Sequence, residues 1–430
     1  MKNILFYSVA LFLFLTSCSD FDDNLVRANP EELLTKNSDL VKLMGKVVNE
    51  ESENPMEPIT CVRFVYPLSI YLYSGDYFQT GVQTFLNRQG FSSFLETLPE
   101  SQLISISYPL EIVFDDETSL FINNNQDLLA SINTCSQEDI IEYGSSIFSS
   151  GEDGNNIDCV WRVPYVENSD NKYASTTFYV SSDYEIKLYY YSDELTGNWA
   201  FLYLGSDLYL NINIEGNNSI SSDWNHNYKV LYIEEQKIHL QFQSEERVLS
   251  RQCESTIEYQ IGQSGPSGGI VAYDKGIYSE GWRYIEIALQ DAINEEWGCL
   301  SLGIENAQNT ALGSGMQNTA AITYNHDLLT NYYTNPQVCN NLNNGSLASK
   351  SALLFQVNQV KDWFLPSSLD LQNIYQNLIP LNLGNFQNTY YWTSSQASVS
   401  QAQCVNFANG EVVNLDKNTP LIKSRVVRYF

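Results

Sequence analysis

The strongest constraint on the fold is a regular alternation of apolar and polar side chains in residues 155–256. It runs through STTFYVSSDYEIKLYYYS, NWAFLYLGSDLYLNINIEG and YKVLYIEEQKIHLQF, and turn glycines such as Gly197, Gly205 and Gly216 separate the runs. Successive side chains of a strand point to opposite faces, so this alternation predicts strands with one buried face. Many short strands at this spacing predict an all-β unit, which is a sandwich, a filled barrel or a barrel that holds a small apolar ligand.

Within this unit the phrases GNWAFLY, LYLNI and YKVLYIEEQKIHLQF follow one another in this order. Their order resembles lipocalin-like domains of exported bacterial proteins.

A duplicated phrase marks residues 57–150. FVYPLSIYLYS and ISYPLEIVFDD place Tyr66-Pro67-Leu68 and Tyr108-Pro109-Leu110 at an interval of 42 residues. A second alternating run and a short helical stretch follow each phrase, so we predict a strand–strand–helix unit that occurs twice, an α+β repeat. The phrase is similar to a repeat in Bacteroidota lipoproteins of unknown function. Because it carries no chemical motif, we expect a structural spacer.

The first residues, MKNILFYSVALFLFLTSCSD, have the layout of a secretory signal. Their apolar run is shorter than the roughly 20 residues that a membrane-spanning helix needs. The ending Leu15-Thr16-Ser17-Cys18 resembles a bacterial lipobox, which implies a signal peptide at 1–17 and acylation of Cys18; the alternative is an ordinary signal peptide. SDFDDN, which follows, resembles the acidic tag that sends Bacteroidota lipoproteins to the outer face of the outer membrane. For residues 18–56 we expect a tether with one short helix.

Export permits disulfide bonds, and the spacing of the cysteines follows the predicted units. Cys61 and Cys135 bracket the repeat unit, while Cys159 and Cys253 bracket the β-rich unit, so we predict these two pairs. The last region holds an odd number of cysteines, so at least one thiol there is free and the pairing is open: Cys299, Cys339 and Cys404.

Residues 258–430 contain a set of aromatic and glycine-rich phrases in a fixed order: GPSGGIVAYDKG, GWRYIEIAL, WGCLSLG, DWFLPSSLDLQNIYQNL, YYWTSS and SRVVRYF. This set resembles the C-terminal domain of collagen-like bacterial adhesins and of a large paralogous lipoprotein family, which is similar to C-type-lectin-like folds. The resemblance implies an α+β domain with two helices and a small sheet. The sequence as a whole thus predicts a multidomain chain: an α+β repeat unit, an all-β unit and a C-type-lectin-like unit.

The two aromatic phrases of this last region are first of all expected in its core. Pro366 should end a strand, Ser367 or Ser368 should cap the following helix, and Asp370 lies in the first helical turn. The loops flanking the phrases are the expected ligand face, with six candidate contact residues: Asp362, Trp363, Ser394, Ser395, Gln396 and Asn409.

The composition excludes several classes of function. A formal net charge of −29 repels nucleic acids and anionic lipid headgroups. The three histidines, His226, His239 and His326, are far apart in sequence, and no calcium-loop, catalytic or phosphate-binding motif is present, so we expect no enzyme, metal or cofactor. The function expected is that of a lipid-anchored outer-membrane adhesin or glycan-binding protein that acts through its last domain without calcium. The alternative is a structural or partner-binding subunit of an outer-membrane complex.

Overall fold

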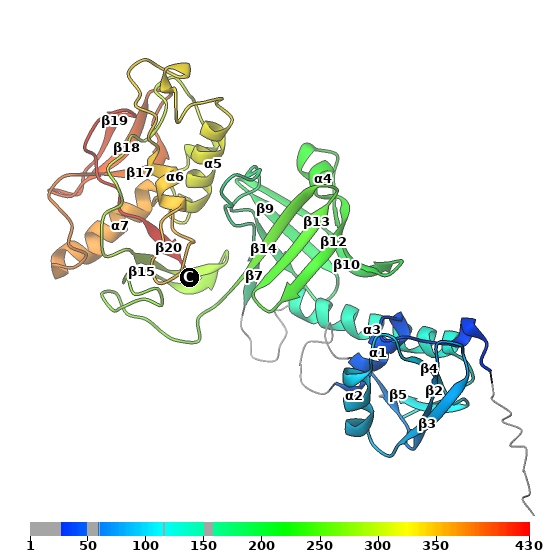
Figure 1. The fold of residues 1–430 in the computed structure, drawn as a ribbon. Coiled ribbons are helices and arrows are strands. Elements are labelled where there is room, and N and C mark those ends of the chain that lie inside the picture. Colours follow the sequence, from blue (N-terminus) through cyan, green and yellow to red (C-terminus); the bar gives the residue numbers. More distant parts are fainter. Residues whose placement is uncertain (1–26, 50–58, 60, 115–116, 150–157) are drawn as a thin grey trace, which may run out of the picture. The chain divides into compact units, whose positions relative to one another are not determined.

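The computed structural model describes residues 27–49, 59, 61–114, 117–149 and 158–430, which form a mostly β chain with several sheets (Figure 1). The chain divides into two compact units, residues 1–140 and 141–430. Within the part that the structure describes, no helix combines the length and the apolar character needed to cross a membrane.

The first unit interleaves its helices with two small sheets. Its elements are η1 (Pro30–Glu32), α1 (Asp39–Val48), β1 (Val62–Phe64), β2 (Leu68–Tyr73), β3 (Gln79–Phe85), α2 (Arg88–Thr97), β4 (Leu103–Ile106), β5 (Leu110–Phe114), β6 (Ser119–Ile122) and α3 (Asn125–Phe148), which continues past residue 140. Helix α1 lies in the segment expected as a tether. Its apolar side chains, Leu40 and Met44 among them, are buried in the same core as β2 and β5, so the folded unit begins before residue 57.

The duplication predicted from the sequence appears as two copies that exchange a strand. Each copy has a short first strand, then a hairpin of two strands, then a helix. The prediction of two strands and a helix for each copy therefore missed the short first strand. β1 pairs with β5 of the second copy, and β4 pairs with β2 of the first, which gives the sheet orders β1-β5-β6 and β3-β2-β4. Because each sheet takes strands from both copies, neither copy can complete its sheet alone.

The all-β unit is a closed eight-stranded barrel, so the barrel forms rather than the sandwich. Its strands pair in chain order, and β14 pairs antiparallel with β7 to close the sheet. They are β7 (Cys159–Arg162), β8 (Thr177–Val180), β9 (Glu185–Tyr190), β10 (Asp193–Leu204), β11 (Asp207–Ile214), β12 (His226–Glu234), β13 (Lys237–Phe242) and β14 (Glu245–Cys253), with α4 (Ser219–Trp224) after β11. At Gly197 a Cβ atom would lie 2.2 Å from the Asn213 carbonyl oxygen, so β10 and β11 can pair there only through a glycine.

Large side chains fill this barrel. The apolar positions of the alternating strands are fully buried, as Phe178 on β8 and Leu188 on β9 show. Phe148, at the end of α3, packs its ring 5.1 Å from that of Trp199. Trp224 of α4 lies 4.8 Å from the ring of Phe178. The alternation therefore produces a packed core.

The last region carries two further sheets, β15-β16-β20 and β17-β18-β19, with helices against them. Its elements are β15 (Ile270–Ser279), β16 (Trp282–Ile287), η2 (Glu305–Ala307), α5 (Gly315–Asp327), η3 (Pro336–Val338), α6 (Ala348–Leu353), α7 (Ser368–Leu378), η4 (Ile379–Leu381), β17 (Tyr390–Gln396), β18 (Gln401–Asn406), β19 (Val412–Asp416) and β20 (Val427–Tyr429). Of the two serines expected as the cap, Ser367 is the one that caps α7: its hydroxyl accepts a hydrogen bond from the Asp370 N–H, and the Ser367 N–H donates one to the Asp370 carboxylate. Trp363 and Trp392 are both fully buried in one core cluster, so both aromatic phrases do determine the fold.

Disulfide bonds join Cys61 to Cys135 and Cys159 to Cys253, the two pairs expected from the spacing. A third bond joins Cys299 to Cys339. Among the described cysteines this leaves Cys404 as a free thiol, buried in the last region, where burial raises its pKa well above the usual value. Since a thiol reacts as the thiolate, Cys404 is expected to be inert in the folded protein.

Candidate functional site

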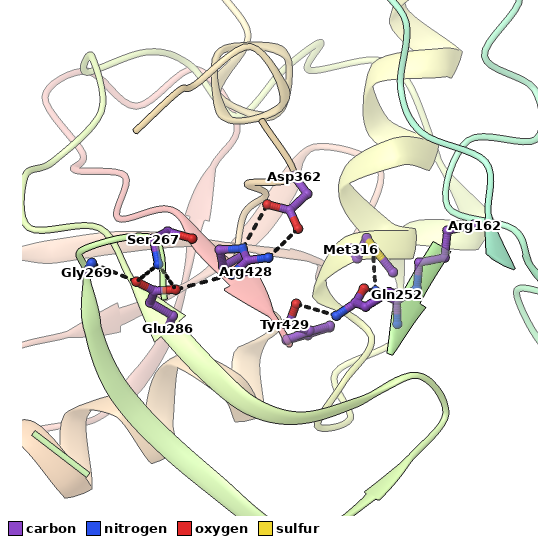
Figure 2. A network of polar contacts seen from close by, with 9 residues as sticks. All are labelled: Arg162, Gln252, Ser267, Gly269, Glu286, Met316, Asp362, Arg428 and Tyr429. Atoms are coloured by element: carbon purple, nitrogen blue, oxygen red, sulfur yellow. Dashed lines mark hydrogen bonds and ion pairs between the residues drawn. The ribbon is translucent and has the colours of Figure 1, made fainter. Parts of the chain in front are cut away.

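A cavity of about 610 Å³ opens between one side of the barrel and the last region. The barrel contributes the end of β7 and parts of β13 and β14, and the last region contributes α5, residues 361–364 and β20. The two sides meet where the Gln252 side chain donates a hydrogen bond of 2.8 Å to the Tyr429 carbonyl (Figure 2). We call this cavity the cationic cleft; its lining residues include Arg162, Ser175, Lys237, Arg251, Gln252, Met316, Lys361, Asp362, Trp363, Phe364, Arg428 and Tyr429.

The charge of the cleft is opposite to that of the chain. Among the described residues its lining holds one carboxylate, that of Asp362, and five basic side chains: Arg162, Lys237, Arg251, Lys361 and Arg428. The whole chain has 22 basic and 51 acidic residues. Clefts lined by one sign of charge concentrate the field and attract ligands of the other sign. The lining of the cleft thus favours an anionic ligand over a cationic one.

Two carboxylates neutralise the charge of Arg428 in the cleft. Phe364 bridges to Val427 of β20 in antiparallel fashion, and this brings Asp362 beside Arg428. The Arg428 guanidinium donates to both Asp362 oxygens at 2.8 Å and to the buried Glu286 carboxylate at 3.3 Å (Figure 2). Burial opposes the charge of Arg428, but these two carboxylates outweigh it and raise its pKa. Glu286 in turn accepts backbone N–H bonds from a glycine-rich turn, at Ser267 and Gly269.

Arg162 carries a buried charge that no carboxylate among the described residues pairs with. Its side chain donates to the side-chain oxygen of Gln252 and to the carbonyl of Gly281 at 2.9 Å, and its Nε has no hydrogen-bond partner among the described residues. Burial lowers its pKa, although a guanidinium stays protonated in proteins. An uncompensated buried cation is costly, so an anion in the cleft would relieve that cost.

Two lysines add further positive charge to the cleft: Lys361, which is exposed, and Lys237, which is half-buried. Lys237 begins β13 and Lys361 precedes Asp362, and within the described part of the chain neither makes an ion pair. Their side chains can therefore reach a ligand without first breaking a salt bridge.

The six ligand-contact candidates are divided between this cleft and the interior. Asp362 and Trp363 line the cleft, but Trp363 is fully buried, with an indole N–H that has no partner among the described residues. Asn409 is exposed in the β18–β19 turn, away from the cleft, where its side chain contacts Glu411. The other three candidates are buried in strand β17, so the expectation that they lie in loops flanking the aromatic phrases is wrong: Ser394, Ser395 and Gln396.

The three buried side chains have partners within the domain. The Ser394 hydroxyl donates to the Pro366 carbonyl at 3.2 Å, and the Ser395 hydroxyl donates to the Asn309 carbonyl at 2.9 Å. Gln396 accepts a hydrogen bond from the buried ammonium of Lys417 at 2.7 Å. These contacts hold loops onto β17, which leaves Asp362 and Asn409 as the candidates that can meet a ligand directly.

The sequence gives no signal that groups the basic residues of the cleft. The basic side chains come from five separate segments, so no local run of positive charge marks them. Arg428 alone has a local signal, because it stands between apolar residues in SRVVRYF, where a strand would point it away from its neighbours.

No group of three or more potential metal ligands of the His, Cys, Asp or Glu type occurs among the residues that the structure describes. No protein-family model matches the chain, and a search of curated proteins finds no match. The site must therefore be interpreted from its own geometry.

Proposed function

We propose that the protein is a lipid-anchored outer-membrane protein that binds acidic glycans in the cationic cleft. The observation that supports this ligand class is the excess of basic side chains in the cleft, five against one, in a chain with a net charge of −29. Carboxylate or sulfate groups on a sugar polymer would supply negatively charged partners for Arg162, Lys237 and Lys361, which form no ion pair with any described residue. Sugar hydroxyls can bond the polar groups beside them.

A glycan is proposed, rather than another anion, because of the last region. Residues 258–430 resemble C-type-lectin-like domains of surface adhesins, and these residues form one wall of the cleft. The volume of about 610 Å³ lies within the range of roughly 300–1,000 Å³ that is usual for ligand pockets.

The membrane anchor rests on the sequence, since Cys18 lies outside the described residues. The lipobox-like ending and the acidic stretch after it support acylation and placement on the cell surface. Several acyl chains hold a protein firmly, at about 0.8 kcal/mol for each buried CH₂ group.

Binding in the cleft should not require calcium. The cleft carboxylate, Asp362, already accepts hydrogen bonds on both oxygens from Arg428. Calcium needs six to eight oxygen ligands, and the cleft offers no comparable set. A chelator such as EDTA is expected to leave binding unchanged.

The experiment is a binding assay of the purified full-length protein on immobilised polygalacturonate, alginate, hyaluronan and heparin, with cellulose and xylan as neutral references. We expect binding to at least one acidic polymer, weakening as salt rises because screening shortens the range of the charges. Lys237→Ala combined with Lys361→Ala should lower the affinity about tenfold, or about 1.4 kcal/mol. Lys187→Ala, which removes an exposed lysine of β9 outside the cleft, is the control.

Two results would count against the proposal. The first is equal binding to acidic and neutral polymers, because a cationic cleft must discriminate by charge. The second is no binding to any polymer, which would favour a partner-binding subunit of an outer-membrane complex instead.

A further inference from the structure

A second, smaller cavity of about 280 Å³ lies between the barrel and the last region. It shares Arg162, Met316 and Tyr429 with the cationic cleft, so one layer of side chains lines both cavities. We call it the tyrosine pocket; its other lining residues include Thr177, Tyr179, Tyr189, Tyr191, Glu280 and Gln317.

The alternation of the barrel strands creates the aromatic side of this pocket. Phe178 and Leu188 point into the barrel and are fully buried, so the neighbouring Tyr179 and Tyr189 point outward. β8 and β9 pair with Thr177 opposite Tyr189, which puts both tyrosines on the same outer face. Their rings meet edge to face, with centroids 5.3 Å apart.

The opposite side of the pocket supplies polar side chains that form no side-chain hydrogen bond or ion pair with another described residue. Gln317 of α5 makes no side-chain hydrogen bond with any other described residue, and the exposed Glu280 makes no ion pair there. Burial raises the pKa of Tyr179 to about 12, so its hydroxyl stays a neutral donor at physiological pH. The pocket thus combines aromatic rings with amide, carboxylate and hydroxyl groups.

The charge of the tyrosine pocket differs from that of the cationic cleft. Its lining holds one basic side chain, the buried Arg162, and one acidic side chain, Glu280. The volume of about 280 Å³ falls just below the usual range for drug-sized ligands, which begins near 300 Å³. A small neutral ligand is therefore favoured over a long or charged one.

We propose that the tyrosine pocket is a second carbohydrate site, which binds one uncharged pyranose ring. The apolar face of the sugar stacks on Tyr189, and the hydroxyls of the sugar bond Gln317 and Glu280. Aromatic rings carry a polar handle beside an apolar surface, and amides and carboxylates offer the acceptors that sugar hydroxyls require. This inference does not depend on acidic-glycan binding, because the two cavities differ in charge.

The test uses saturation-transfer-difference NMR on the purified full-length protein with uncharged methyl glycosides as probes: those of glucose, galactose, mannose and N-acetylglucosamine. We expect at least one probe to bind in the millimolar range. Tyr189→Ala and Gln317→Ala should each weaken binding at least fivefold. Tyr209→Ala, which changes a half-buried tyrosine of β11 outside both cavities, should leave it unchanged.

The double change Lys237→Ala with Lys361→Ala should also leave binding of these uncharged probes unchanged, which separates this site from the cationic cleft. The proposal is overturned if none of the probes binds, or if binding survives both Tyr189→Ala and Gln317→Ala. Binding that disappears in the lysine variant would equally overturn it, because the sugar would then occupy the cleft.

Discussion

Asp362→Asn tests the role of the cleft carboxylate directly. Asp362 is the acidic side chain of the cationic cleft, and each of its carboxylate oxygens accepts a hydrogen bond of 2.8 Å from Arg428. If the cleft binds anions, this carboxylate repels the ligand while it positions Arg428. Replacing it with the isosteric amide removes the negative charge but keeps one acceptor for Arg428. We therefore expect tighter binding of acidic glycans.

The size of the effect follows from Coulomb's law. For an anionic group held roughly 7 Å from Asp362, removal of one charge is worth about 0.6 kcal/mol in water and about 2.4 kcal/mol at an effective dielectric constant near 20. The Asp362 side chain is 47% exposed, so solvent screening keeps the gain near the lower end, at about 1 kcal/mol. This corresponds to about a fivefold gain in affinity. The partly exposed pair with Arg428 should cost less than about 1 kcal/mol of unfolding free energy.

The assay is isothermal titration of the full-length protein with the best-binding acidic polymer, beside urea denaturation of the same variants. Asp193→Asn, which neutralises an exposed acid at the start of β10, provides a control for the change in net charge. If Asp362→Asn binds more weakly than the unmodified protein while Asp193→Asn does not, Asp362 is a ligand contact and the charge argument fails.

Three further outcomes are expected. Cys18→Ala should release the protein from the membrane fraction, which fractionation with and without detergent measures. Arg428→Gln should lower the unfolding free energy by about 3–5 kcal/mol in urea denaturation, because it leaves the buried Glu286 without its cation. Burial lowers the pKa of Lys417 to about 7, whereas in the unfolded chain it is about 10.4. The buried charge therefore lowers the free energy of unfolding most below pH 7, and this loss of stability fades as the pH rises from 7 to about 10.4. Lys417→Met should therefore gain stability relative to the unmodified protein near pH 6 and lose that advantage by pH 10, as thermal melts at each pH would show.

The local sequence pattern was sufficient to predict features that depend on a single strand or helix. The alternation in residues 155–256 predicted strands, and the serines after Pro366 predicted a cap for α7 at Ser367 or Ser368, of which Ser367 is the one observed. The cysteine spacing indicated the pairs Cys61–Cys135 and Cys159–Cys253 because each pair brackets a unit.

Long-range pairing was beyond the reach of the pattern. Nothing local tells β1 to pair with β5 instead of a strand of its own copy, because either partner would bury the same alternating face. The same limit applied to Ser394, Ser395 and Gln396, whose polar side chains suggested a loop. In the structure they are buried, and each has a hydrogen-bond partner in a distant segment of the chain. The cleft cations could not be grouped for the same reason, since their proximity exists only in the folded chain.

The seam that closes the barrel connects these observations. β7 and β14 meet there, with Cys159 opposite Cys253 and joined to it by a disulfide. The same two strands carry Arg162 and Gln252, whose side chains donate hydrogen bonds to the carbonyls of Gly281 and Tyr429 in the last region. Both cavities border this seam, since Arg162 lines each of them. A bond that fixes the ends of two strands thereby also fixes the side chains between the cavities, so the barrel wall positions both sites.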